Sequence, residues 1–238
     1  VHESLRRLNT EFIDVLWVHA WDSWTPTEEI MKGLEDLVSR GMVHYIGVSD
    51  TPAWVVSQAN TMAQLRGWSQ FVGLQIEYSL IQRSVEPELM QMARAFGMTV
   101  TPWAPLAGGA LTGKYLRGEQ GRITPQSARL GERAVSITKK VVEVAERLGV
   151  SPAQVAINWT RQHKGQSIVP IVGATKPAQL EDVLGCLKFE IPTDAMNELN
   201  DVSKIELPFP HKFFSESGVL DVLYGGVKET MKDRRFGE

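Results

Sequence analysis

The sequence predicts an α/β fold built around an all-parallel sheet. Short apolar runs rich in β-branched and aromatic residues alternate with longer segments whose apolar residues recur at helical spacing. The runs are apolar at nearly every position, as expected for parallel strands buried on both faces. Each run ends in polar residues, and right-handed connections bring the carboxyl ends of such strands to one side of the sheet. The expected strands are Phe12–His19, Val43–Val48, Phe71–Ile76, Met98–Trp103 and Ser167–Val172.

Helix signals lie between these strands. Val1–Leu8 has the apolar spacing of the last turns of an amphipathic helix. Thr27, followed by two glutamates, marks the start of the next helix, and Gly41 marks its end. The other expected helices are Ala53–Arg66, Glu86–Phe96, Glu132–Leu148, Ala153–His163, Ala178–Leu187 and Ala195–Val202.

Two longer segments complete the chain. A glycine-containing connection, Pro105–Gly131, follows the fourth expected strand, and a tail runs from Lys204 to Glu238 with a helix expected near Val219–Met231. The length of 238 residues suits one large domain or two small ones. We expect a single domain over residues 1–238 with residues 204–238 as its tail.

Composition excludes several functional classes. The net charge of −3 argues against nucleic acid or an anionic membrane as the main partner. No apolar run approaches the roughly 18 residues of a membrane span. The single cysteine, Cys186, rules out an intramolecular disulfide and a cysteine-rich zinc site, so no metal site is expected and a reducing cytoplasm fits. We expect Cys186 to be a small apolar packing residue.

His19 is the first candidate for chemistry. It ends an apolar run, and α/β folds place their catalytic residues at the carboxyl ends of parallel strands. The alternative is a histidine that closes the core by bonding a neighbouring carbonyl. The fragment Gly108–Lys114 superficially suggests a phosphate loop, but it lacks the spacing and the terminal hydroxyl residue of that motif.

Five blocks of sequence resemble the aldo-keto reductases. In chain order they are Ser4–Asp22, Tyr45–Asp50, Leu74–Leu80, Thr101–Lys114 and Ile171–Asp182. The blocks are similar to the fourth to eighth strands of that family. The resemblance therefore implies a (β/α)8 TIM barrel of which only strands 4–8 and their helices are present. It also implies an oxidoreductase that uses NADP(H) to reduce aldehydes and ketones.

The resemblance assigns roles to individual residues. It implies that His19 is the catalytic histidine, which hydrogen-bonds the substrate carbonyl oxygen. The implied contacts to the nicotinamide are Ser49, Asp50 and Gln75 on its carboxamide and Trp103 on its ring. The implied pyrophosphate loop comprises Ala104, Leu106, Gly108 and Gly109, and the implied adenosine end comprises Gly173, Thr175, Lys176, Gln179 and Asp182. A lysine near a helix start suits a 2′-phosphate, so NADPH is expected rather than NADH.

Three site residues depart from the family pattern. Asp50 replaces the commoner asparagine, and a carboxylate can accept a hydrogen bond but cannot donate one unless protonated. Ala104 replaces a frequent serine and loses one hydroxyl contact. Trp103 replaces the more usual tyrosine, although either aromatic ring supplies a flat apolar wall.

The family's first three βα units would precede Ser4, and this chain lacks them. They carry an aspartate, a proton-donating tyrosine and a lysine, so we expect the chain alone to be inactive. Its own tyrosines lie elsewhere, and Tyr78 is expected to pack against neighbouring loops. We expect the chain to be part of a reductase of about 330 residues, with open sheet edges at Phe12–His19 and Ser167–Val172. The alternative is a truncated protein that pairs with another chain.

Two functions follow from these residues. The first is a carbonyl reductase acting on a small molecule, with Trp21 and Trp24 walling a pocket for aromatic or apolar carbonyls. Simple loop packing is the alternative role for the two tryptophans. The second function is a non-catalytic NADPH-binding regulatory subunit of the channel-associated type. The segment Pro208–Phe214 is expected either to fold over the pocket or to form a homo-oligomer contact.

Overall fold

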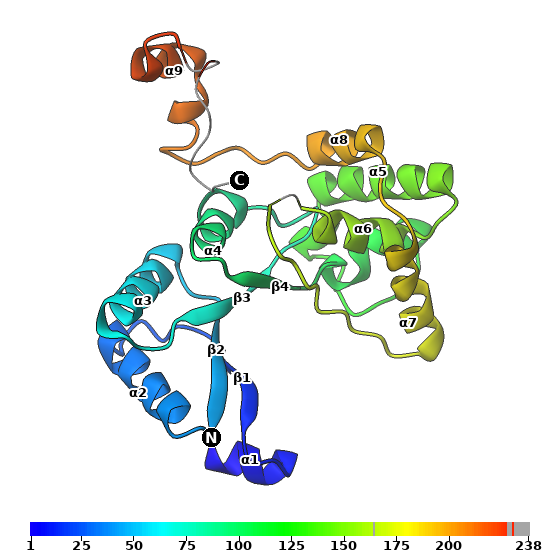
Figure 1. Ribbon diagram of the computed structural model, residues 1–238. Helices are drawn as coiled ribbons and strands as arrows, with labels where there is room; N and C mark the ends of the chain where they lie inside the picture. The colour runs from blue at the N-terminus through cyan, green and yellow to red at the C-terminus, as the bar shows by residue number, and fades with distance from the viewer. Residues whose placement is uncertain (164, 228–229, 231–238) are drawn as a thin grey trace.

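The computed structural model describes residues 1–163, 165–227 and 230 (Figure 1). Within these residues the strands form one parallel sheet whose spatial order follows the chain. The strands are β1 Ile13–Val18, β2 Val43–Ser49, β3 Phe71–Glu77 and β4 Thr99–Trp103. This arrangement is the parallel α/β architecture expected for part of a (β/α)8 barrel.

Helices connect the strands and cover one face of the sheet. Before β4 they are α1 His2–Leu8, α2 Thr27–Ser39, α3 Ala53–Arg66, the π-helical turn η1 Glu86–Met90 and α4 Gln91–Ala95. After β4 they are α5 Glu132–Leu148, α6 Pro152–Arg161, α7 Pro177–Leu184, α8 Thr193–Val202 and α9 Ser217–Tyr224. Short 3₁₀ segments are η2 Ala107–Thr112, η3 Lys114–Arg117, η4 Ala128–Leu130, η5 Gly185–Lys188 and η6 Phe213–Ser215.

The helices agree with the sequence prediction apart from their ends. The expected helix Glu86–Phe96 begins as η1 and continues as α4, with Pro87 in its first turn. The expected Ala178–Leu187 divides into α7 and η5. The tail leaves α8 and includes α9, which stands apart from the sheet (Figure 1). Part of the helix expected near Val219–Met231 lies outside the described residues.

The prediction that the first strand is buried on both faces is wrong for this chain. Among the described residues β1 pairs with β2 only, and each of its six residues is exposed or half-buried. Val15, at the middle of the strand, is 38% exposed. The apolar run forms a strand because of its local sequence, but burial needs a neighbour on each side. β1 is therefore an open edge of the sheet, as the resemblance led us to expect.

The fifth expected strand, Ser167–Val172, runs beside β4 but forms only one isolated bridge, between Val100 and Ile168. Hydrogen bonds join Val100 N–H to Ser167 O (2.9 Å) and Val169 N–H to Val100 O (2.9 Å). The next rung of a parallel ladder would need an N–H from Pro102, which proline lacks. The segment is therefore extended and paired with β4 without completing a regular strand.

The two faces of the sheet differ sharply in composition. Alternate residues of β2, β3 and β4 point to the helices and are almost completely buried. These helix-side residues are Ile46, Val48, Leu74, Ile76, Val100 and Pro102. The opposite face carries small or polar residues together with Trp17. In rows across the sheet these are Trp17, Gly47, Gly73 and Thr99, then Ser49, Gln75 and Thr101, then Glu77 and Trp103.

Trp17 occupies the first of these rows. A Cβ atom added to Gly47 would lie 2.6 Å from the Trp17 ring, and one added to Gly73 would lie 2.7 Å from it. The indole therefore spans the backbone of two neighbouring strands, and both positions need glycine while the ring is there. The row above it holds the polar residues at the carboxyl ends of the strands.

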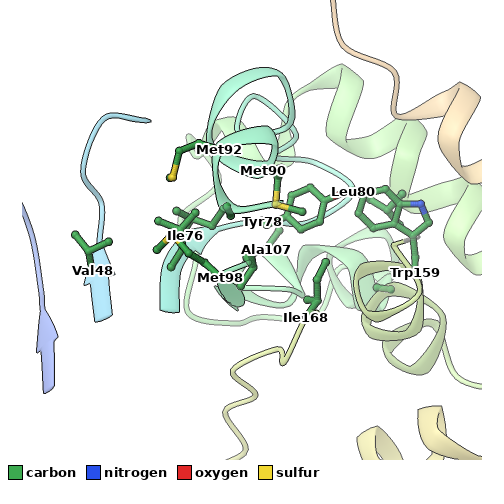
Figure 2. Packing of buried hydrophobic residues seen from close by; sticks show 14 of the residues in the cluster. Val48, Ile76, Tyr78, Leu80, Met90, Met92, Met98, Ala107, Trp159 and Ile168 are labelled. Carbon is green, nitrogen blue, oxygen red and sulfur yellow. The ribbon is translucent and has the colours of Figure 1, made fainter. Parts of the chain in front are cut away.

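Apart from Pro102, the helix-side residues belong to one large apolar core (Figure 2). Tyr78, just beyond β3, is completely buried there and lies against the Trp159 ring of α6, with centroids 5.4 Å apart. Its hydroxyl donates to Glu86 Oε1 at 2.7 Å, and Arg83 Nε donates to the same oxygen at 2.8 Å. Burial, followed by the charge of Glu86, raises the pKa of Tyr78, so this tyrosine is a packing residue rather than a proton donor.

Three further sequence predictions concern what the chain lacks or buries. Cys186 is buried in a small apolar cluster with Ala153, Ile157 and Val183, as expected, and burial raises the pKa of its thiol. Over the described residues, no group of histidine, cysteine, aspartate and glutamate side chains could hold a metal ion. No helix in that same part of the chain is long and apolar enough to cross a membrane.

Asn60 fixes the start of β3 against α3. Its side chain is fully buried, and it accepts from Phe71 N–H at 2.8 Å and donates to Phe71 O at 3.1 Å. The pairing with β2 shifts here, because Ile46 pairs with Phe71 while Gly47 pairs with Gly73. Phe71 therefore turns to the helix side, and its backbone groups bond the Asn60 amide.

Replacing Asn60 with leucine should lower the free energy of unfolding by about 3 kcal/mol, because two buried backbone groups of Phe71 lose their partner. The midpoint of urea unfolding, with an unchanged slope, measures this loss. Gln64→Leu makes the same kind of change at an exposed position of α3 and should stay within about 0.5 kcal/mol of the parent. Equal losses in both variants would contradict the role given to Asn60.

Candidate active site

The first cluster of predicted site residues lies at the carboxyl ends of β2, β3 and β4. Ser49 pairs with Gln75 across the sheet, and Asp50 N–H donates to Gln75 O at 3.3 Å. Trp103 Nε1 donates to Asp50 Oδ1 at 3.3 Å. The structure thus brings together the four residues Ser49, Asp50, Gln75 and Trp103. A backbone φ of +44° at Asp50 turns the chain sharply just after β2.

Ser49 is the most unusual member of this cluster. It is only 1% exposed, yet among the described residues its hydroxyl has no hydrogen-bond partner. A buried hydroxyl without a partner is costly, so such a group often indicates a position where a ligand binds. The Ser49 carbonyl, by contrast, accepts from Thr51 Oγ1 at 2.9 Å.

His19 follows β1 at the open edge of the sheet. It is exposed, and it stands two residues beyond Trp17, the spacing that keeps side chains on one face of an extended chain. Its neighbour on the sheet is β2, which carries Ser49. This spacing predicts that His19 lies at the same side of the sheet as the cluster, and no strand of the described residues pairs with β1 on its other edge.

The loop after β4 forms a second group of predicted residues, Ala104, Leu106, Gly108 and Gly109. Ala107 N–H donates to Ala104 O at 2.8 Å and Gly109 N–H to Leu106 O at 2.9 Å, which closes two tight turns. Gly108 and Gly109 have φ values of +69° and +93°. Successive backbone units of this kind create a concavity that suits anions, and glycine permits both the conformation and a close approach.

Two cationic side chains lie against these glycines, and sequence reasoning missed both as site residues. A Cβ on Gly109 would lie 3.0–3.1 Å from the end of Lys114, and one on Gly108 would lie 3.4 Å from Arg129 Nη1. Arg129 Nη2 in turn donates to Glu77 Oε1 at 2.5 Å. The sequence contained one signal for the ion pair between Arg129 and Glu77. Glu77 follows Gln75 by two residues, and this spacing keeps both side chains on the polar face of the sheet.

The third group of predicted residues surrounds the start of α7 and is mostly exposed. Gln179 Oε1 accepts from the backbone N–H of Thr175 (2.9 Å) and of Lys176 (3.2 Å), which caps the helix. Asp182 accepts from Ser151 Oγ at 2.9 Å and from Gln154 Nε2 at 3.0 Å. Gln179 and Asp182 thus have structural partners, whereas Lys176 remains an exposed cation beside a helix start.

Leu106 connects the second and third groups. It packs on the small cluster that contains Cys186, and so does Val172, which precedes Gly173. The turn after β4 and the approach to α7 are therefore neighbours. The three groups follow one another from the strand ends, through the glycine loop, to the start of α7 (Figure 1).

Trp21 and Trp24, which were predicted to line a substrate pocket, lie apart from these three groups of residues. Trp21 contacts the Trp54 ring edge-on, with centroids 5.7 Å apart, and lines a small cavity on the helix side between α2 and α3. Trp24 is 90% exposed. Asp22 fixes the loop by accepting from Thr25 Oγ1 (2.5 Å) and from two backbone N–H groups, and these bonds lower its pKa.

Comparisons with known proteins support one family for this fold and these residues. The model of the "Aldo/keto reductase family" matches residues 1–204. The chain belongs to the aldo/keto reductase family. The resemblance seen in the sequence is thereby confirmed, although the role of each residue is a separate question.

Three relatives of this aldo/keto reductase chain illustrate the match. It is 34% identical to a probable aryl-alcohol dehydrogenase of Saccharomyces cerevisiae over 91% of the chain and 68% of the relative. It is 35% identical to an aryl-alcohol dehydrogenase [NADP(+)] of Phanerodontia chrysosporium over 94% and 60%. It is 33% identical to a norsolorinic acid reductase of Emericella nidulans over 91% and 55%. The chain thus spans between about half and two thirds of the length of these relatives.

Opposite effects are expected when the two hydroxyls near the end of β2 are removed. Ser49→Ala should raise the free energy of unfolding by about 1 kcal/mol, because it removes a buried hydroxyl without a partner. Thr51→Val should lower it by about 1 kcal/mol, because the bond to the Ser49 carbonyl is lost. Urea unfolding of both variants measures the two changes. A loss in both would mean that the Ser49 hydroxyl is already satisfied.

Proposed function

We propose that this protein is an NADPH-dependent oxidoreductase that interconverts carbonyl compounds and alcohols, and that this chain supplies the cofactor half of its barrel. The observation that carries the proposal is the Ser49 hydroxyl, which lies buried at the carboxyl end of a strand and has no partner in the part of the chain that the structure describes. It belongs to a cluster with Asp50, Gln75 and Trp103, beside a glycine turn that has cations around it.

A nicotinamide dinucleotide fits the three groups of residues. The Ser49 hydroxyl and the Gln75 amide offer donors and acceptors for a carboxamide, and the half-buried indole of Trp103 offers an apolar wall. Asp50 accepts from the indole N–H, so it holds the plane of that ring as well as offering an acceptor. The turn at Gly108 and Gly109, with Lys114 and Arg129 close by, suits the pyrophosphate.

The chemistry that the cofactor supplies when bound is a hydride for the carbonyl carbon. His19 would donate a hydrogen bond to the carbonyl oxygen and so stabilise the negative charge that develops there. The resulting alkoxide needs a proton, and a poised general acid must provide it. Tyr78 is excluded because it is buried and bonded to Glu86. We therefore propose that the acid comes from outside this chain, beside the open edge of β1.

The dinucleotide preference and the substrate class are finer parts of the proposal. Lys176 is an exposed cation at the amino end of α7, which suits a 2′-phosphate and favours NADPH. The names of the relatives, two aryl-alcohol dehydrogenases and a norsolorinic acid reductase, favour aromatic carbonyls and alcohols as substrates. That Trp21 and Trp24 line the pocket for such substrates stays a prediction.

His19→Gln should lower kcat for an aromatic aldehyde by about 100-fold with an unchanged Kd for NADPH, because the lost interaction is made at the carbonyl oxygen. The protein is expressed from its complete coding sequence, turnover is followed by NADPH absorbance, and Kd by quenching of tryptophan fluorescence.

His44→Gln is the matched control, since His44 is exposed on β2 away from the strand's carboxyl end. It should leave kcat unchanged. NADPH binding by the parent without turnover of any carbonyl would favour the regulatory binding subunit instead. Absence of NADPH binding would overturn the proposed function altogether.

Lys176→Ala should weaken NADPH binding by roughly 10-fold and leave NADH binding unchanged, since only NADPH carries the 2′-phosphate. Fluorescence titration with each dinucleotide gives the two Kd values. Lys188→Ala removes an exposed lysine of η5 and should change neither. A parallel loss for NADPH and NADH would show that Lys176 does not recognise the 2′-phosphate.

A further inference from the structure

Two carboxylate side chains belong to the surroundings of Trp103 in the candidate site. Glu77 is the last residue of β3 and pairs with Trp103 in the sheet. Asp50 directly follows β2, and its Oδ1 accepts a hydrogen bond from Trp103 Nε1 at 3.3 Å. The two acids therefore adjoin one aromatic residue from two neighbouring strands.

The two carboxylates differ in whether a cation pairs with them. Arg129 Nη2 donates to Glu77 Oε1 at 2.5 Å, and the side chains of Arg129 and Glu77 are only 29% and 22% exposed. Asp50 is exposed, and within the described ranges it forms no ion pair. The hydrogen bond that its side chain accepts comes from a neutral indole. The charge of Glu77 is therefore balanced by Arg129, whereas no cation of the described chain balances that of Asp50.

Backbone and side-chain bonds together fix the place of the Asp50 charge. The backbone turns at a φ of +44°, and Asp50 N–H donates to Gln75 O at 3.3 Å. The bond from Trp103 uses only Oδ1, and a carboxylate has a second oxygen that can accept from another group. The carboxylate is therefore held at the nitrogen edge of the indole, the ring against which we propose that the nicotinamide lies.

Neither the hydrogen bond nor the backbone at this position needs a charged residue. Asparagine has an amide oxygen that could accept from Trp103 Nε1 in the same way. It also tolerates a positive φ about as well as aspartate does. What Asp50 adds over the commoner asparagine is therefore a negative charge.

We propose that the Asp50 carboxylate favours the oxidised dinucleotide, because the oxidised nicotinamide ring carries a positive charge and the reduced ring is neutral. This inference rests on the proposed function. As a hydride leaves the ring with its electron pair for the carbonyl carbon, the ring gains one positive charge. The alkoxide that forms takes a proton from the general acid. A fixed negative charge beside the ring stabilises the charge that develops there, so Asp50 promotes carbonyl reduction over the reverse reaction.

Asp50→Asn should weaken the binding of oxidised dinucleotides alone, so the ratio of Kd for NADP+ to Kd for NADPH should rise by about 5-fold. The change is modest because water screens the charge of an exposed side chain. Fluorescence titration of the protein expressed from its complete coding sequence gives both values. NAD+ and NADH have the same two rings, so their ratio should change equally. Asp201→Asn removes an exposed aspartate of α8 and should leave both ratios unchanged.

The rates of hydride transfer in the two directions separate a charge effect from damage to the site. In single turnovers with an aromatic aldehyde and its alcohol, Asp50→Asn should slow reduction and quicken oxidation. The ratio of the two rate constants should fall by about 5-fold. Damage to the site would slow both directions alike. Equal slowing in both directions, or equal weakening of oxidised and reduced dinucleotides, would overturn the inference.

A second variant keeps the test decisive if Asp50→Asn does not fold, which thermal unfolding would reveal. Asp50→Gly also removes the charge, and glycine accepts the positive φ without strain, so it should raise the Kd ratio in the same way.

The parent protein separates failure of this inference from failure of the proposed function. If the parent binds no dinucleotide, the proposed function fails and the inference fails with it. If the parent binds them and the Asp50 and Asp201 variants keep its Kd ratios, the function stands and the inference alone fails.

Discussion

The arrangement of this protein depends on the alternation of side chains along four parallel strands. Every second residue of β2, β3 and β4 enters the core beneath the helices, and the residues between them face the other way. Because the strands are parallel, this second set ends at one side of the sheet. Ser49, Gln75 and Trp103 reach that side for the same reason that Val48, Ile76 and Pro102 are buried. The alternation of side chains therefore produces both the core and the candidate site.

Features that depend on local sequence were predictable. Apolar runs and helix-spaced segments gave the order of the elements, and the resemblance predicted the family. Features that depend on residues in another element of the fold were not predictable from the sequence. The burial of Phe12–His19 depends on what packs beside it, and among the described residues β1 pairs with β2 alone. The regularity of Ser167–Val172 depends on a missing N–H at Pro102, in another strand. The bond between Asn60 and Phe71 depends on how a helix meets a strand.

The same division applies to the site. Positions at the carboxyl ends of the strands could be predicted, and the structure brings Ser49, Asp50, Gln75 and Trp103 together. Their roles toward a cofactor stay predictions. The ion pair between Glu77 and Arg129 has no motif, because its members belong to different elements. Likewise, the direction in which Trp21 points depends on how the loop after β1 folds, and Asp22 governs that fold through bonds within the loop.

The Trp17 ring covers the backbone on the polar side of the sheet. It lies over Gly47 and Gly73, so one side chain fills space that three strands would otherwise share. The next row, with Ser49 and Gln75, stands immediately above that ring. A ligand held by these residues, as we propose for the dinucleotide, would meet the indole and could not pass between the strands. The depth of the proposed site would thus be set by one large residue and two glycines, none of which carries a reactive group.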